Sequence, residues 1–298
     1  MPSKRRKDKD EAPPECSPPD PVLDLTTKEQ IIRNLVQPCT PELSNEERAQ
    51  DLFYEAMGAA TPRQMIKLLQ EVLALDPDHV DTRLVLLEAA DCSPTARIEE
   101  LRKIVASAIR KLGTRAIEEY KPHFWGFIQT RPYMRARANL AEELLSAGLT
   151  EESTREYEEM LELNPGDNQG LRYILLPCYL ALNYQKEALK LIKKYPGEVN
   201  YNAAFAWGNA LLTFLSMEKN GLEIALEAAR KQNGHMEAYL LGHRAIPKNT
   251  PGGYTLGSQE EAKCFAKSMK DAWDHHPEAL AWLALQKADK KRGDRSKK

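Results

Sequence analysis

The sequence predicts an all-α protein, an α–α superhelix (a solenoid of antiparallel helix pairs), and three observations predict it. Helix-start signals recur along the chain, and helix-breaking residues recur between the segments that those signals open. Period-two alternation with clusters of Val, Ile and Thr is almost absent, so little of the sequence is suited to a β-sheet. We expect about six helical pairs, together spanning residues 24–286.

The helix boundaries are predicted by short local signals. A side chain that caps a helix stands ahead of an apolar run or just before a proline, which suits the first helical position. These start signals are Thr26-x-x-Glu29, Ser44-x-x-Glu47, Thr61-Pro62 and Ser93-Pro94. Glycines suited to a left-handed cap and residue–proline pairs end the helical pattern. These stop signals are Gly113, Gly148, Asp76-Pro77, Asn164-Pro165 and Tyr195-Pro196.

Composition separates a globular body from two tails. The chain is 42% hydrophobic and 29% charged, which permits a continuous core under solvated helix faces. Its first 20 residues hold five prolines, five basic and five acidic side chains, and residues 287–298 hold seven basic and two acidic ones. Such segments bury too little apolar surface to fold. We therefore expect a disordered N-terminal tail at 1–23 and a basic disordered C-terminal tail at 287–298.

Cysteine spacing and hydropathy bear on the compartment. The five cysteines are scattered and never in CxxC spacing, which is typical of a reducing compartment and argues against a disulfide framework or a zinc site. The charged, proline-rich start does not resemble a signal peptide. The longest apolar stretch, residues 171–184, is broken by Arg172 and Pro177 and is too short to span a bilayer. We expect a cytoplasmic protein with no membrane partner and no metal or other cofactor.

Residues 134–167, MRARANLAEELLSAGLTEESTREYEEMLELNPGD, carry the clearest repeat. Their spacing resembles the tetratricopeptide repeat of about 34 residues. The matching positions are Leu140, Ala141, Leu144, Gly148, Ser153, Tyr157 and Pro165, whereas Arg137 and Met160 depart from the pattern. Small residues at Ala141 and Ser153 should let the two helices approach closely. Partial matches follow the same spacing at 46–79, 168–196 and 201–234, and the resemblance implies a tetratricopeptide-like superhelix.

The C-terminal segment 235–283 has a narrower resemblance. Its matching features are Tyr239-Leu240-Leu241, Gly257-Ser258 with Glu261-Ala262, and Trp273 ahead of Glu278-Ala279-Leu280. In these features it looks like the C-terminal module of the suppression-of-tumorigenicity protein 7 family and its bacterial repeat-bearing relatives. That family has no settled biochemical activity, so the resemblance bears on the fold. As the last module of a solenoid, this segment is expected to cap an apolar edge formed by Trp207, Leu211 and Leu212.

The sequence offers few candidates for chemistry. The loop 252–258 contains glycines but lacks the Gly-Lys-Ser/Thr ending of a phosphate-binding loop, and we interpret it as a structural loop that ends in a helix cap at Ser258. Adjacent His275 and His276 lack ligand spacing, and we interpret them as a solvated helix end before Pro277. No hydrolase, metalloprotease or kinase signature is present. We therefore expect no catalytic residues, and an enzyme with an unrecognised site is the alternative.

Two segments are candidates for binding. The aromatic segment 123–133 is interpreted as a buried connector in preference to a binding surface. By resemblance to the repeat, the first helices of the pairs line a concave groove whose Arg, Asn and Tyr side chains suit an extended peptide. The candidate groove residues are Arg135, Asn139, Glu142, Arg172, Tyr173, Tyr179, Asn202 and Asn209. The favoured function is a scaffold or adaptor that binds a protein or peptide in this groove.

Two further functions were weighed against this one. Basic tails would support a nucleic-acid-associated protein, but residues 287–298 contain no aromatic side chain for base stacking, and we do not expect nucleic acid as the partner. Tetratricopeptide co-chaperones grip a terminal carboxylate with lysine and asparagine, where this chain has Gln50 and Tyr54. We therefore expect little binding to chaperone tails, and loss of any groove partner on Arg172→Glu. Partner identity and oligomeric state are left open.

Overall fold

The computed structural model describes residues 29–30, 43–217 and 219–296. All the regular structure in these ranges is helical, with no strand, which confirms the all-α prediction. Glu29 and Gln30 are helical, whereas Thr26 and the tail predicted at 1–23 lie outside the described residues.

The helices follow one another in pairs. In the N-terminal half they are α2 (Asn45–Met57), α3 (Pro62–Leu75), α4 (Val80–Ala89), α5 (Pro94–Leu112), α6 (Arg115–Tyr120), the 3₁₀ turns η1 (Phe124–Gly126) and η2 (Ile128–Thr130), α7 (Arg131–Ser146) and α8 (Thr150–Leu163). In the C-terminal half they are α9 (Arg172–Ala181), α10 (Gln185–Lys194), α11 (Glu198–Tyr201), α12 (Ala203–Leu215), α13 (Lys219–Asn233), α14 (Met236–Leu240), α15 (Gln259–Asp274) and α16 (Pro277–Ser296).

The predicted start signals are confirmed as helix caps. Ser44 and Glu47 form a capping box at the start of α2, and the hydroxyls of Thr61 and Ser93 accept the capping hydrogen bonds of α3 and α5. Ser258 caps α15 in the same way, as the interpretation of loop 252–258 required. Each of these side chains satisfies a backbone N–H group that has no partner inside its helix.

The predicted stop signals are also confirmed. Gly113 adopts φ +82° directly after α5, and Gly148 adopts φ +80° just beyond α7. The residues ahead of the predicted prolines, Asp76, Asn164 and Tyr195, are the C-caps of α3, α8 and α10.

The C-terminal end differs from the prediction. Helix α16 continues to Ser296, through most of the segment 287–298 that was expected to be disordered. Its first turns carry strong helix formers such as Leu280 and Ala281, and the following Lys, Ala and Arg residues also favour helix. Extending an existing helix costs much less than nucleating a new one, so low hydrophobicity alone does not end it.

Small residues bring helices together where the repeat spacing predicts close approach. The Ser153 hydroxyl donates a 2.7 Å hydrogen bond to the Ala141 carbonyl oxygen, and both side chains are fully buried between α7 and α8. Gly208 on α12 lies so close to α9 that a Cβ atom there would be 2.8 Å from Leu176 Cδ2. The predicted contact between the two helices of this pair is confirmed at Ala141 and Ser153.

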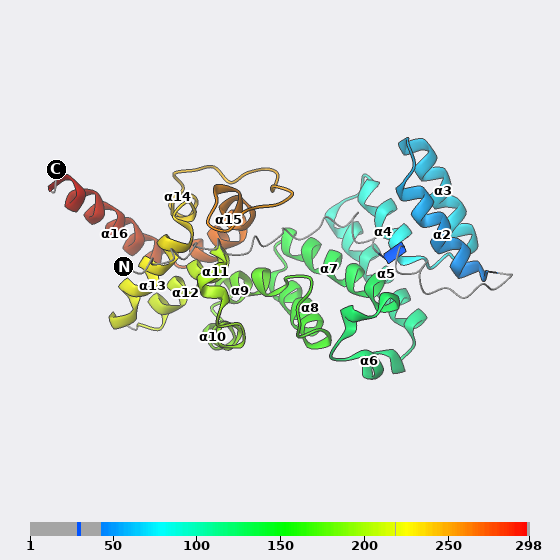
Figure 1. Ribbon diagram of the computed structural model, residues 1–298, viewed down its shortest axis with the longest axis horizontal. Helices are drawn as coiled ribbons and strands as arrows, with labels where there is room; N and C mark the ends of the chain where they lie inside the picture. The colour runs from blue at the N-terminus through cyan, green and yellow to red at the C-terminus, as the bar shows by residue number, and fades with distance from the viewer. Residues whose placement is uncertain (1–28, 31–42, 218, 297–298) are drawn as a thin grey trace, which may run out of the picture.

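The last helices do not simply extend the row of pairs. Figure 1 shows an elongated molecule with α2 and α3 at one end, and α15 turned back beside α9 instead of continuing beyond α13. Helix α15 packs on both α9 and α12, which are the first helices of two successive pairs. The Trp207 and Trp273 rings meet edge to face at 6.2 Å in this contact, and both are fully buried. The C-terminal module thus covers Trp207 by lying across first helices.

The aromatic segment 123–133 is part of the core. Phe124 and Trp125 are buried, and the Phe124 ring packs edge to face on Tyr133 of α7. The interpretation of this segment as a buried connector is confirmed, although Phe127 remains 40% exposed beside Tyr120. Among the described helices, none is long and apolar enough to cross a bilayer.

Candidate functional site

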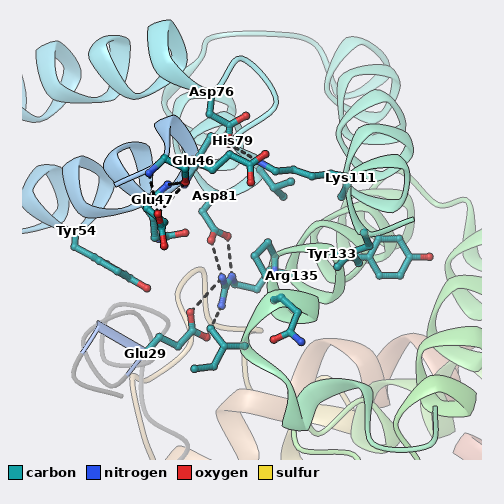
Figure 2. A pocket seen from close by; sticks show the side chains of 18 residues that line it. Glu29, Glu46, Glu47, Tyr54, Asp76, His79, Asp81, Lys111, Tyr133 and Arg135 are labelled. Carbon is teal, nitrogen blue, oxygen red and sulfur yellow. Dashed lines mark hydrogen bonds and ion pairs between the residues drawn. The ribbon is translucent and has the colours of Figure 1, made fainter. Parts of the chain in front are cut away.

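A groove of about 750 Å³ opens between α2, α4 and α7. Helix α2 contributes Gln50 and Tyr54 to its wall, the turn after α3 contributes Asp76, and α7 contributes Tyr133 and Arg135. Figure 2 shows Arg135 between Asp81 and Glu29, with Glu29 from the N-terminal segment on the side opposite Asp81. The groove therefore combines the first helices of three pairs with a residue from far earlier in the chain.

Arg135 is the centre of the ion pairs in this groove. Its Nε and Nη2 atoms donate to the two carboxylate oxygens of Asp81 at 2.8 and 2.6 Å, and its Nη1 atom donates to Glu29 Oε1 at 2.9 Å. The guanidinium is almost fully buried. Burial lowers the pKa of Arg135, but the attraction of Asp81 and Glu29 is stronger and raises that pKa overall. Arg135 is therefore a permanent buried cation between two carboxylates.

Arg131 stands one turn before Arg135 on α7 and faces the same carboxylate. Its Nη1 atom lies 3.2 Å from Glu29 Oε1, while its Nε atom donates to the Trp125 carbonyl oxygen at 3.0 Å. The guanidinium carbon also lies 5.6 Å from the centre of the Trp125 ring. A carbonyl and an aromatic face thus fix Arg131 in position to bind the Glu29 carboxylate.

The opposite wall is built around His79. Its Nδ1 atom accepts a hydrogen bond from the Thr82 backbone N–H at 3.3 Å and so caps α4, and its ring packs against Phe53. Burial lowers the pKa of His79, so the ring is neutral at pH 7. Beside it, Lys111 of α5 pairs with Asp76.

The groove has an acidic wall whose cations are already paired. Its lining includes five carboxylates, against the two cationic side chains Lys111 and Arg135. Lys111 also lies 3.6 Å from Glu46, and Arg135 holds two carboxylates. The groove accordingly has a negative net charge while Glu29 is bound.

The face shared by α9 and α12 is covered by the chain itself. The Tyr173 ring of α9 packs edge to face on Phe265 of α15, at 6.0 Å between ring centres. Glu261 of α15 is fully buried, and it accepts hydrogen bonds from Ala203 N at the start of α12, from Gly257 N, and from the side chains of Gln232 and Asn233. A peptide cannot reach Tyr173 from this side without displacing α15.

Arg172 is held by its own neighbours near that covered face. Its Nη1 atom donates to Asp167 Oδ2 at 2.8 Å, and its Nη2 atom lies 2.9 Å from Glu198 Oε1. The guanidinium stacks over Tyr173 at 4.3 Å and lies 5.2 Å from the Tyr195 ring. Arg172 therefore ties the loop before α9 to α11, and its charge is fully committed to these intramolecular contacts.

The remaining candidate residues are dispersed. Asn139 and Glu142 are exposed on α7, and Asn139 Nδ2 donates to the Arg135 carbonyl oxygen in its own helix. Tyr179 hydrogen-bonds to Glu158 of α8 and lines a different hollow of about 530 Å³ between α8 and α10. Asn209 is half-buried on α12.

Four expectations about exposure are wrong. Tyr179 of the predicted groove is buried, with 7% of its surface exposed. Arg135 was expected to be exposed in the groove, but it is buried under its ion pairs with Glu29 and Asp81. Asn202 is 2% exposed because its side chain caps α12 and accepts from Ala204 N and Phe205 N. His276 is also buried, not solvated, and its Nε2 atom hydrogen-bonds to the Leu180 carbonyl oxygen of α9 at 2.8 Å.

The sequence interpretation missed the acidic partners of the groove arginines. Asp81 and Glu29 were not among the candidates, and Glu29 was interpreted only as part of a capping box. The spacing of Arg131 and Arg135, one helical turn apart, was the available signal that two cations share one face of α7. No protein-family profile, curated protein sequence or solved structure matches this chain. Within the described residues, no three His, Cys, Asp or Glu side chains are grouped to hold a metal ion.

Proposed function

We propose that this protein is a scaffold that binds a segment of a partner protein in the groove between α2, α4 and α7. The single observation that carries the proposal is that this groove, of about 750 Å³, remains open while α15 covers α9 and α12. Binding would thus be confined to the N-terminal half of the concave face, and would not run along all the candidate residues from Arg135 to Asn209.

The proposal includes a tetratricopeptide-like superhelix as the frame. It is supported by the helix pairs, by the small-residue contact of Ala141 with Ser153, and by the packing of α4 on α7 and of α9 on α12 as successive first helices. Grooves of this kind bind extended peptides through polar side chains on rigid helices, which requires no catalytic group. We accordingly propose a non-enzymatic, cytoplasmic adaptor whose partner is a protein or peptide and not a nucleic acid.

A peptide-library selection with the full chain tests the function. Peptides that bind reproducibly would be mapped by hydrogen–deuterium exchange of the complex. We expect increased protection in α2, α4 and α7, with little change in α8 and α10, which line the second hollow. Protection confined to α8 and α10, or no selected peptide, would refute the proposed function.

Two matched substitutions add a second readout. Gln50→Arg adds one positive charge to the groove wall on α2, and Glu187→Gln changes the charge of the second hollow on α10 by the same amount and in the same direction. We expect only Gln50→Arg to alter the affinity of the selected peptides by about tenfold or more, in either direction according to their charge.

A further inference from the structure

The groove already contains a side chain that occupies it as a ligand would. Glu29 lies 102 residues before Arg131 and 106 before Arg135 in the sequence, yet its carboxylate is bound by both guanidinium groups. Its side chain is only 3% exposed, so the carboxylate has exchanged water for these two arginines. Because two preorganised arginines bind a carboxylate from a distant part of the chain, this position is suited to a carboxylate ligand.

Two buried carboxylates from distant parts of the chain, Glu29 and Glu261, are held very differently. Glu261 accepts hydrogen bonds from two backbone N–H groups and two side-chain amides, and it lies on α15, which packs on both α9 and α12. Glu29 is held, within the described structure, by Arg131 and Arg135. Glu261 is thus built into the fold, whereas the contacts of Glu29 are ones that any other carboxylate can reproduce.

The charges around Arg131 and Arg135 favour exchange of Glu29 for another anion over loss of Glu29 with no anion in its place. Without Glu29, the buried cluster of Arg131, Arg135 and Asp81 has one more positive than negative charge. An uncompensated charge in a buried site is strongly unfavourable, so the arginines require an anion. The ion pair described for Asp81 is with Arg135, through both of its oxygens, whereas the ion pair described for Arg131 is with Glu29.

We propose that the groove binds an acidic side chain of an extended partner segment at Arg131 and Arg135, and that the chain's own Glu29 competes for this position. The inference rests on the proposed function and adds the chemistry of the partner: an internal Asp or Glu. Because Glu29 is tethered, it competes at an effective concentration on the order of millimolar. A partner carboxylate must therefore bind strongly enough to displace it. Removal of the Glu29 charge therefore exposes the site to acidic segments.

The probe for this inference is a labelled synthetic peptide of the chain's own residues 22–36, VLDLTTKEQIIRNLV, together with its Glu29→Gln form. Fluorescence anisotropy measures its binding to the full chain in three forms: unchanged, Glu29→Gln and Glu46→Gln. Glu46 is an exposed carboxylate in the same groove that pairs with Lys111, and its substitution is the matched control.

We expect the acidic peptide to bind the Glu29→Gln chain at least about tenfold more tightly than the unchanged chain or the Glu46→Gln chain. The peptide that carries Glu29→Gln should bind the Glu29→Gln chain at least about tenfold more weakly than the acidic peptide does. A second variant, Arg131→Gln combined with Glu29→Gln, should weaken the acidic peptide again while circular dichroism shows an unchanged helix content.

Equal binding to all chains, no binding to the Glu29→Gln chain, or equal binding of both peptides would overturn the inference. Failure of the inference is distinguishable from failure of the proposed function. If library peptides protect α2, α4 and α7 but their affinity does not respond to Glu29→Gln, the groove binds a partner without using the Glu29 position. If they do not protect these helices, the proposed function itself is wrong.

Discussion

Glu261→Gln should destabilise the protein far more than an exposed substitution of the same kind. The Glu261 carboxylate accepts from Ala203 N at 2.9 Å through Oε1 and from Gly257 N at 2.7 Å through Oε2. An amide has an oxygen on one side only, so in either orientation an NH₂ group faces one of these backbone donors. Gln232 and Asn233 also donate to the carboxylate. The Asn233 amide is itself fixed, because its Nδ2 also donates to the Ser258 carbonyl oxygen and its Oδ1 accepts from His235 N. The two backbone N–H groups cannot turn to find another acceptor.

The expected magnitude follows from this mismatch. A buried donor left without an acceptor costs about 1–3 kcal/mol, and hydrogen bonds to a charged acceptor contribute about 1.5–3 kcal/mol each. The substituted amide is uncharged, so the cost of burying an anion is removed, and this offsets part of the lost stability. We therefore expect the free energy of unfolding to fall by about 2–3 kcal/mol, and the melting temperature to fall by roughly 4–12 °C for a domain of this size.

Glu260→Gln is the matched control for this measurement. Glu260 precedes Glu261 on α15, is exposed, and pairs only with Lys263 among the described side chains, at 3.4 Å. We expect thermal unfolding followed by circular dichroism to change little for this variant, within about 0.5 kcal/mol. Amide exchange at Ala203 and Gly257 should accelerate for Glu261→Gln alone. If both variants melt at the same temperature, the buried carboxylate does not hold α15 on α12, and the reasoning fails.

The remaining predictions concern a histidine, a glycine and a cysteine. Because burial lowers the pKa of His79 below its ordinary value of 6.5, the unfolded chain binds the proton first, and stability should fall as pH decreases through 6.5 and below. His79→Asn keeps an acceptor that can cap α4 but removes the titrating ring, so the urea midpoint should change less with pH in this variant. An unchanged pH dependence would contradict the assignment of this effect to His79. Gly208→Val should cost about 1–3 kcal/mol in urea unfolding because its side chain meets Leu176, while Gly197→Ala, which faces open space, should be neutral. Burial raises the pKa of the Cys178 thiol to about 12, so peptide mass spectrometry should find native Cys178 unmodified by iodoacetamide while half-buried Cys92 reacts; comparable labelling of the two would show that α9 opens readily.

Much of the local structure was predictable because helix boundaries depend on neighbouring residues. The caps at Ser44, Thr61, Ser93 and Ser258 and the stops at Gly113 and Gly148 form where the sequence predicts them. The same holds for the contact between Ala141 and Ser153, since both lie within one helix pair. These features involve hydrogen bonds or packing over short sequence separations, which a spacing argument captures.

The position of α15 was not predictable by the same route. A repeat pattern assumes that each unit contacts the next one along the chain, so the C-terminal module was expected to cover an end. It does cover Trp207, but by packing across α12 and across α9, the helix that carries Tyr173. The contact that covers Tyr173, with the Phe265 ring of α15, joins segments far apart in the sequence, and no local signal encodes it.

The two acidic residues Glu29 and Glu261 share a misleading local pattern. Glu29 follows Thr26, and Glu261 follows Ser258, with the three-residue spacing of a capping box. Ser258 does cap α15, but the Glu261 carboxylate accepts from Ala203 N, 58 residues away, and the Glu29 carboxylate is bound by Arg131 and Arg135. A glutamate at this spacing can therefore bind residues far away in the sequence, and only the tertiary structure shows this contact.

These contacts change what Arg172→Glu would measure. The substitution was expected to repel a partner from the groove, but Arg172 is bound to Asp167 and Glu198 beside the face that α15 covers. A glutamate there would place three carboxylates together and leave the loop before α9 without its cation, so the protein would lose stability whether or not it binds anything. Arg131 is the better position for testing the groove, because its carboxylate partner in the described structure is Glu29, the side chain that a ligand would replace.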